Sequence, residues 1–208
     1  SDVCSSDLTV GKGGGTVSTN TVVGYQAQNA TNSGGGMTAV GYQAGYSNTT
    51  GTDNSFFGYQ AGYSTSTGAT RMTAIGYQAA YSNTTGSESV AVGRYALRQN
   101  TTGANLIAVG HEALYNNTTA SNQTAVGYQA GYSNSTATSH AVLVGFQAGY
   151  SNTSGDYFTA VGYQAAYSNT SGRFNTAFGK GALYTNSTGQ DNTALGNSAL
   201  NLATGSSN

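Results

Sequence analysis

Proline and tryptophan are absent from this chain, cysteine occurs once, and charged residues are scarce. Only 6 % of the residues are charged, against about 25 % in an ordinary domain, and the formal net charge is −1. This balance excludes the basic surface that a nucleic acid or an anionic membrane would need, so we expect no nucleic-acid partner. No apolar run approaches the roughly 20 residues of a membrane span, and no charged start followed by an apolar stretch marks a signal peptide.

The single cysteine lies in a foreign-looking first segment, Ser1–Leu8, which reads SDVCSSDL. That segment resembles the translation of a common sequencing-adapter end, so we interpret residues 1–8 as an artefact, with a genuine polar leader as the alternative. Cys4 then says nothing about the redox compartment. Residues 9–20 are expected to be a degenerate coil or a disordered lead. Residues 21–208 are expected to be one repeat domain that continues beyond Asn208 in the full protein.

What the chain does contain is one short unit repeated eleven times. A glycine, taken as position 0, recurs every 17 residues and twice after 18, with an apolar residue at −1 and an alanine at +3 in every repeat. A unit this short cannot bury a core alone and must stack on its neighbours, so the period predicts a solenoid. The glycines are Gly24, Gly41, Gly58, Gly76, Gly93, Gly110, Gly127, Gly145, Gly162, Gly179 and Gly196.

Two strands are expected in each coil. β-Branched residues at −3 to −1, as in Thr38–Val40, predict the first, and the stretch from +1 to +5, as in Tyr128–Tyr132, predicts the second. The S-N-T-T-G stretch that follows has turn composition. The predicted fold is therefore an all-β parallel β-solenoid of eleven 17-residue coils, with the −1 and +3 residues filling a thin interior and the glycine at a tight corner or close backbone approach.

The residues at +1 and +4 vary together. Seven coils carry an aromatic residue at +1 with Gly, Ala or Gln at +4, whereas the four coils with Arg94, His111, Lys180 or Asn197 at +1 all carry leucine at +4. We hypothesise that the two side chains compete for one volume.

The repeat resembles the head repeats of trimeric autotransporter adhesins of the YadA type, and similar repeats occur in phage tail-fibre shafts. The pattern N-T-A-(V/L/F)-G-x-x-A-L-x-x-N-T-T-G carries the resemblance, and its closest copies are Asn175–Gly189 and Asn192–Leu200. The resemblance implies a left-handed β-roll in which three chains associate. The tyrosine content and the period of 17 depart from that family, and its membrane anchor, coiled-coil stalk or a tail-fibre chaperone domain are not present in this segment.

No catalytic, cofactor or metal site is expected. The nearest acids in the variable turn, Asp53 and Glu88, are two coils apart, which is about 10 Å by strand spacing. This exceeds the distance between the two carboxylates of a glycosidase. His111 and His140 have no cysteine or carboxylate at ligand spacing. Gly11–Gly15 lacks the spacing of a phosphate loop. A glycan-processing β-helix enzyme remains an outlying alternative.

Asparagine recurs at +7 in N-x-S/T triplets. The structural interpretation is an Asn-Thr-Thr-Gly turn, and the functional alternative is a row of N-glycan acceptors on an exposed edge, which would make the rod a glycan-coated extracellular filament. The candidate acceptors are Asn48, Asn83, Asn100, Asn117, Asn134, Asn152, Asn169 and Asn186.

Tyrosine recurs at +5 and forms a candidate interface or surface ladder. We favour stacking between coils or burial between chains over a flat strip that binds sugars, because a long exposed tyrosine strip would be sticky. The residues are Tyr46, Tyr63, Tyr81, Tyr115, Tyr132, Tyr150, Tyr167 and Tyr184.

The sequence therefore favours a non-enzymatic rod at the cell surface, in the extracellular space or on a virion. We expect it to serve as a shaft or head segment of an adhesin or fibre, as a homo-oligomer (a trimer) or filament, with a phage tail-fibre shaft as the alternative. Repeated weak contacts along such a rod would add up to useful avidity for a surface receptor or glycan that the sequence does not identify.

Overall fold

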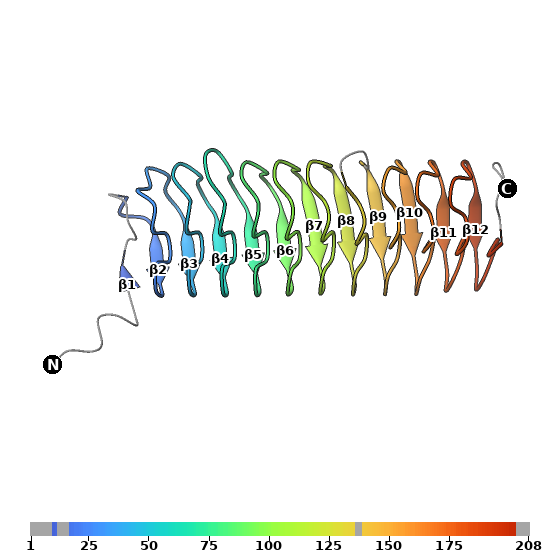
Figure 1. Ribbon diagram of the computed structural model, residues 1–208, viewed down its shortest axis with the longest axis horizontal. Helices are drawn as coiled ribbons and strands as arrows, with labels where there is room; N and C mark the ends of the chain where they lie inside the picture. The colour runs from blue at the N-terminus through green and yellow to red at the C-terminus, as the bar shows by residue number, and fades with distance from the viewer. Residues whose placement is uncertain (1–9, 12–16, 136–138, 203–208) are drawn as a thin grey trace.

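The chain forms a single long β-solenoid (Figure 1), seen in a computed structural model that describes residues 10–11, 17–135 and 139–202. One sheet runs along the rod with its strands in chain order from β1 to β12. The strands are β1 Val10–Gly11, β2 Thr21–Val23, β3 Thr38–Val40, β4 Ser55–Phe57, β5 Thr73–Ile75, β6 Val90–Val92, β7 Leu106–Val109, β8 Gln123–Val126, β9 Ala141–Val144, β10 Phe158–Val161, β11 Thr176–Phe178 and β12 Thr193–Leu195.

Strands β2 to β12 are parallel, and each pairs with its counterpart one coil further along. The register holds across both 18-residue intervals, where Ser55 pairs with Thr73 and Thr124 pairs with Val142, so the extra residue of each interval lies outside the strands. The predicted parallel β-solenoid is confirmed. The described residues form no helix, and hence none long and apolar enough to cross a membrane.

The beginning of the rod departs from the repeat. β1 runs antiparallel to β2, with Val10 opposite Val23, so this pair does not continue the parallel stack. Asn20 already belongs to the first coil, because its Oδ1 accepts a hydrogen bond from the Met37 N–H at 3.0 Å. The predicted artefact at residues 1–8 and the expected continuation after Asn208 lie outside the described residues.

The prediction that the −1 residue fills the interior is wrong. The middle residue of each strand, at −2, points inward, as for the buried Ala39 and Phe56, while the −1 residue is outward and partly exposed. Phe57 and Ile75 at −1 are 39 % and 41 % exposed. Alternate strand residues must face opposite sides, so −2 and −1 cannot both be internal. The alanines at +3 lie inside as predicted, from Ala27 to Ala182.

The second predicted strand is also wrong, because residues +1 to +5 form consecutive turns. Backbone φ is positive at alternate positions: Gly127 at 137°, Gln129 at 51° and Gly131 at 62°. Strand residues need negative φ, so this alternation rules out a pleated strand. The turns still join coils by backbone hydrogen bonds, such as Gln43 N–H to Tyr25 C=O at 2.9 Å.

The glycine at position 0 marks the closest backbone approach between coils. A Cβ placed on Gly110 would lie 2.3 Å from the Gly127 carbonyl oxygen, and φ at Gly110 is +137°, which side-chain-bearing residues rarely adopt. The prediction of a close backbone approach is thus confirmed.

The hypothesis that the +1 and +4 side chains compete is wrong, since +1 is exposed and +4 is buried. The +4 residue competes instead with the inward strand residue. A Cβ on Gly45 or Gly62 would lie 2.8 or 2.5 Å from the Phe56 ring, and one on Gly131 would lie 2.6 Å from Leu143. Each buried leucine at +4 is accompanied by alanine at −2 of its own coil: Leu97 with Ala91, Leu114 with Ala108 and Leu183 with Ala177. The reverse does not hold, because other coils with alanine at −2 carry glycine or alanine at +4. In a closely packed narrow interior a large residue at one of these positions leaves room only for a small one at the other.

Replacing Gly110 should separate steric collision from backbone strain. We expect Gly110→Ala, and more so Gly110→Val, to lower the free energy of unfolding by more than about 4 kcal/mol, because the side chain strikes the next coil. Gly196 is the matched control: its φ is +124° but no atom lies within 4 Å of an added Cβ. Gly196→Ala should cost about 1–3 kcal/mol of strain alone. Equal losses in chemical denaturation would contradict the collision argument.

Candidate functional site: the side-chain ladders

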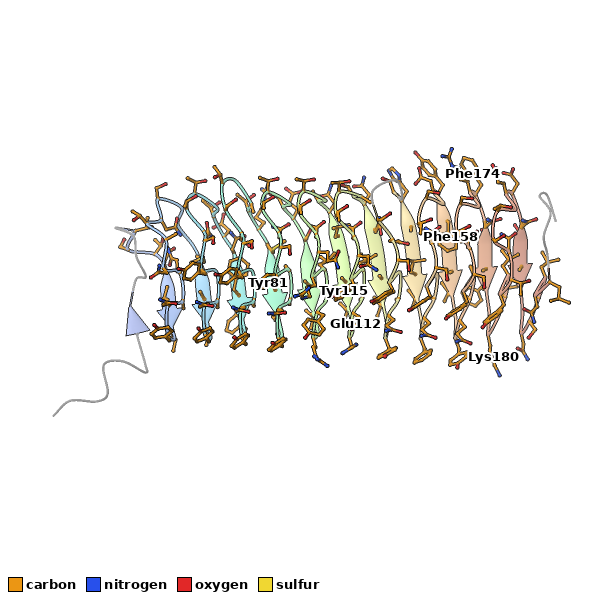
Figure 2. All side chains as sticks on the ribbon, in the orientation of Figure 1. Tyr81, Glu112, Tyr115, Phe158, Phe174 and Lys180 are labelled. Atoms are coloured by element: carbon orange, nitrogen blue, oxygen red, sulfur yellow. The ribbon has the colours of Figure 1, made fainter. Side chains whose placement is uncertain are left out.

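Stacking turns each repeat position into a ladder of side chains along the rod, and Figure 2 shows these rows. Four ladders lie outside or at the surface: the apolar residues at −1, rings at +1, amides at +2 and tyrosines at +5. Three lie inside: the asparagines at +7, the apolar residues at −2 and the alanines at +3.

The asparagines at +7 lie inside the coil. All eight candidate glycan acceptors are fully buried. Their Nδ2 atoms donate hydrogen bonds within the turn and along the rod: Asn100 Nδ2 donates to Asn83 Oδ1 at 2.8 Å and to the Gly103 carbonyl at 3.0 Å. This is the turn interpretation with a buried amide network added. A sugar attached to these Nδ2 atoms would have no space in this fold, which removes the physical basis for a glycan coat at these residues.

The glutamines at +2 form an amide ladder at the surface. Gln43 Nε2 donates to Gln26 Oε1 at 2.8 Å, and the same bond recurs at Gln60 and Gln78. A second run begins at Glu112, whose Oε2 accepts from Gln129 Nε2 at 2.7 Å. Each bond spans one coil, so the ladder ties neighbouring coils together. Sequence reasoning missed this ladder, although the recurrence of glutamine at +2 was its signal.

The tyrosines at +5 are half-buried and stack ring on ring. Tyr132 and Tyr150 lie 5.1 Å apart between ring centroids with an interplanar angle of 7°, and the pairs from Tyr46 to Tyr81 and from Tyr115 to Tyr184 repeat this geometry. Stacked rings hide their faces from each other and present edges and hydroxyls to solvent. The ladder therefore stabilises the stack and lacks the open aromatic faces on which a sugar ring would lie.

The rings at +1 form an aromatic row that is more exposed than the one at +5. Tyr25, Tyr42, Tyr59, Tyr77, Tyr128, Phe146 and Tyr163 are 40–48 % exposed. They stack like the +5 ring ladder, as Tyr42 and Tyr59 do at 4.9 Å and 9°. His111 takes one place in this ladder and stacks on Tyr128 at 5.3 Å. Its role is that of another ring in the stack.

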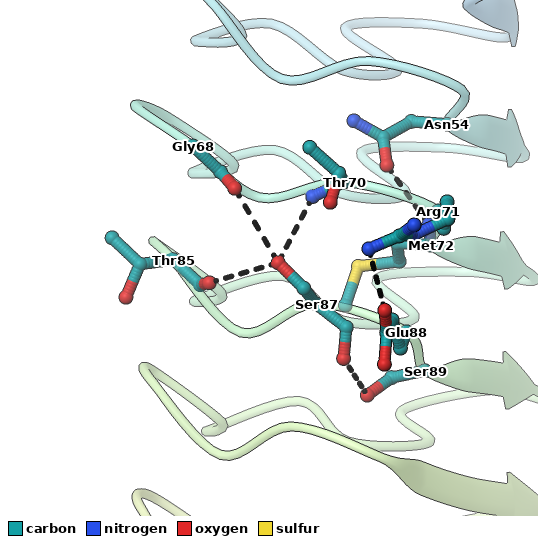
Figure 3. Close-up of polar contacts among 9 residues, drawn as sticks. All are labelled: Asn54, Gly68, Thr70, Arg71, Met72, Thr85, Ser87, Glu88 and Ser89. Atoms are coloured by element: carbon teal, nitrogen blue, oxygen red, sulfur yellow. Dashed lines mark hydrogen bonds and ion pairs between the residues drawn. The ribbon is translucent and has the colours of Figure 1, made fainter.

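The acidic residues are dispersed along the rod. Asp53, Glu88 and Asp191 lie at −5 of different coils, with Glu112 at +2 and Asp156 at −6. Glu88 pairs with Arg71 at 2.5 Å beside the Ser87 hydroxyl, which accepts from the Thr70 N–H at 3.1 Å (Figure 3). Both members of this ion pair are exposed, so it contributes about 0–1 kcal/mol.

The histidines and acids form no metal site in the described part of the chain, where no group of three or more His, Cys, Asp or Glu side chains is placed to hold an ion. His140 lies 4.0 Å from Asp156 and stacks on Tyr157 at 4.7 Å, and His111 lies 3.7 Å from Glu112. These contacts are pairwise: His140 meets residues of the next coil, and His111 meets the residue that follows it in its own coil.

The regular ladders are interrupted together in one coil midway along the rod. After Gly93 the sequence is Arg94, Tyr95, Ala96, Leu97 and Arg98, so the +1 ring, the +2 glutamine and the +5 tyrosine are all replaced. The Tyr95 ring stands at 78° to Tyr77, perpendicular to the stack it enters. The last coil, after Gly196, also lacks all three, so the Gly93 coil is the one place within the rod where the three ladders break together in the described residues.

Comparison with protein-family models, with curated proteins and with solved structures finds no significant match.

Removing one amide of the buried ladder should weaken the rod. Asn117 Nδ2 donates to Asn100 Oδ1 at 2.8 Å and to the Ala120 carbonyl at 3.1 Å, so Asn117→Ala leaves two buried acceptors without a donor. We expect a loss of about 1–3 kcal/mol in the free energy of unfolding. The neighbouring Asn116→Ala makes the same chemical change at a half-buried side chain and serves as the control. Equal stabilities of the two variants in chemical denaturation would contradict the prediction.

The +5 tyrosines should make the rod sensitive to alkali. Burial, and next the neighbouring tyrosines, raise the pKa of Tyr63 above its ordinary value of 10.0, and burial together with Glu112 and the adjacent rings raises the pKa of Tyr132 and Tyr150. An unfolded tyrosine then ionises before a folded one, so stability is fully present below about pH 10 and falls as the pH rises through it. Melting temperatures measured from neutral pH to beyond pH 10 check this, and Tyr63→Phe should reduce the loss. A melting temperature that stays constant past pH 10 would count against it.

Proposed function

We propose that the chain is a non-enzymatic segment of an extracellular fibre or adhesin, and that its rod associates side by side with other copies. The observation that carries this proposal is the −1 ladder: the residue is apolar in all eleven coils, yet it lies on the outside. Strand geometry leaves no interior role for it. A row of valine, isoleucine, leucine and phenylalanine along a rod is an apolar stripe that favours burial against another surface.

The partner surface is another copy of the same chain. The resemblance to trimeric adhesin heads supports three chains around one axis, left-handed coils and a surface location. Parallel, in-register copies would meet with identical ladders facing each other, which matches the uniform composition of the −1 row. Such an assembly would have a stiffness suited to a shaft or head.

The proposal that the rod is not an enzyme is supported by the placement of its acids. Asp53 and Glu88 occupy the same corner two coils apart, about 10 Å at the usual strand spacing, and Glu88 is bound to Arg71. Glycosidase carboxylates stand about 5–9.5 Å apart across the scissile bond.

A phage tail-fibre shaft is the second candidate, and the resemblance of the repeat to such shafts favours it. The same stripe and the same stacked coils serve both functions, because a tail fibre also needs a stiff shaft on the virion. The full-length chain distinguishes them: a membrane anchor beyond the repeats indicates an adhesin, and a tail-attachment domain indicates a fibre.

Charge on the stripe should separate the copies. We expect the wild-type chain to run as a trimer in light scattering and analytical ultracentrifugation, and the double variant Val109→Lys/Val126→Lys to run as a monomer with unchanged circular dichroism. These valines point outward at −1, so the lysines need not disturb the interior. Thr119→Lys adds charge at an exposed turn and should leave the trimer intact. A monomeric wild-type chain, or a trimer that survives both lysines, would overturn the proposal.

A further inference from the structure

Two arginines occupy the coil in which the surface ladders are interrupted. Arg94 stands where most coils have a ring at +1, and Arg98 where most have a tyrosine at +5. Both guanidinium groups lie on the Tyr95 ring, with their carbons 4.5 and 5.4 Å from its centroid. Because both guanidinium groups lie against the same ring, the two cations are close together. This is notable in a chain with very few charged residues.

Arg98 is held in place from several sides. Its Nε donates to Gln78 Oε1 at 3.0 Å, its Nη1 donates to the Tyr115 hydroxyl at 3.3 Å, and its guanidinium also lies 5.4 Å from the Tyr81 ring. Figure 2 shows Tyr81 and Tyr115, which belong to the coils on either side of the Arg98 coil. A guanidinium has five N–H donors, so Arg98 keeps donors to spare. Fixing the side chain in advance reduces the entropy lost when a ligand binds.

Neither arginine has a carboxylate partner in the described part of the chain. Arg94 Nη2 donates to the Tyr95 hydroxyl at 3.4 Å, and its Nη1 lies 3.5 Å from His111 Nε2. The nearby acid, Glu112, accepts from Gln129 and lies beside His111. The pair therefore presents positive charge that the fold itself does not neutralise.

We propose that Arg94 and Arg98 bind the carboxylate or sulfate group of an acidic polysaccharide. The planar guanidinium matches both oxyanions with paired N–H donors. This inference rests on the proposed adhesive function and gives it a ligand class.

The surface beside the arginines suits the neutral remainder of a sugar chain. Arg98 at +5 reaches Gln78 at +2, so the tyrosine and glutamine ladders adjoin. Further along, the hydroxyls of Tyr132, Tyr150 and Tyr167 make no hydrogen bond within the described residues and recur at the 5.1 Å ring spacing. That spacing is close to the length of one pyranose unit in an extended chain. Phenol hydroxyls and amides can exchange hydrogen bonds with sugar hydroxyls.

A nucleic acid fits this surface poorly. Its affinity comes from many phosphate contacts, whereas the whole sequence has six lysines and arginines and a net charge of −1. An acidic polysaccharide with one charge per sugar exposes mostly hydroxyl groups. It therefore makes fewer ionic contacts, and more neutral hydrogen bonds, than a nucleic acid does.

The test is affinity electrophoresis of the 208-residue chain through gels that contain polygalacturonate, dextran sulfate or neutral dextran. We expect retardation by one or both charged polymers and none by dextran. The double variant Arg94→Tyr/Arg98→Tyr restores the +1 and +5 rings while it removes both charges, so its fold should be retained. It should lose at least about tenfold in affinity, as expected when charge-assisted contacts are removed. Lys180→Tyr makes the same change at +1 of a distant coil and should bind like wild type.

The outcomes separate the sources of the oxyanion and the two proposals. Retardation by polygalacturonate alone assigns a uronate ligand, retardation by dextran sulfate alone a sulfated one, and equal retardation a site for either oxyanion. No retardation of the wild type, or an equal loss in Lys180→Tyr, overturns the site. Light scattering on the same samples reports the oligomer. If a variant loses binding while its trimer is intact, the loss is due to the binding site and not to the assembly. If Arg94→Tyr/Arg98→Tyr loses the trimer, the arginines join chains, and the inference is overturned.

Discussion

The close contact between successive glycine corners is the constraint on which the rest of the rod depends. From Gly24 to Gly179 the backbone of one coil approaches the carbonyl of the next so closely that no Cβ fits between them. That distance fixes the spacing between coils, and the fixed spacing aligns the strand, the turns and every side chain with its copy one coil away. Backbone hydrogen bonds then run between coils in the turns as well as in the sheet. The occasional extra residue is tolerated because the register of the strands remains unchanged.

Alignment of like with like decides which side chains each position accepts. A charged residue repeated at the coil spacing would repel its own copies, whereas a ring can stack on its copy and an amide can both donate to and accept from one. The chain is accordingly rich in tyrosine, glutamine and asparagine and poor in charge. Charges enter where a run of amides ends: Arg98 donates to Gln78 at the end of the first glutamine run, and Glu112 accepts from Gln129 at the start of the second.

The period alone predicted the parallel stack, because no other arrangement lets so short a unit bury a core. It did not predict which strand residue lies inside. Both −2 and −1 are apolar in most coils, and a strand of three residues is too short for its alternation to be read from hydrophobicity. The turn at +1 to +5 was mistaken for a strand because its tyrosines favour strands, while the left-handed backbone at Gln129 has no signature in residue type. The buried asparagines could not be told from glycan acceptors, because both readings use the same triplet.

The outward apolar stripe and the uniform ladders have different consequences for recognition. A stripe that repeats in every coil can join copies of the rod, but it offers the same contact everywhere and cannot mark one place along its length. A specific ligand needs a position that differs from its neighbours, and in a ladder such a position loses stacking and amide bonds with both adjacent coils. The coil of Arg94, Tyr95 and Arg98 departs from three ladders at once, and its perpendicular ring and arginine contacts replace the bonds that were lost. The departure leaves two cations without a carboxylate on a nearly neutral rod, which is why we place selective binding at this coil and self-association along the stripe.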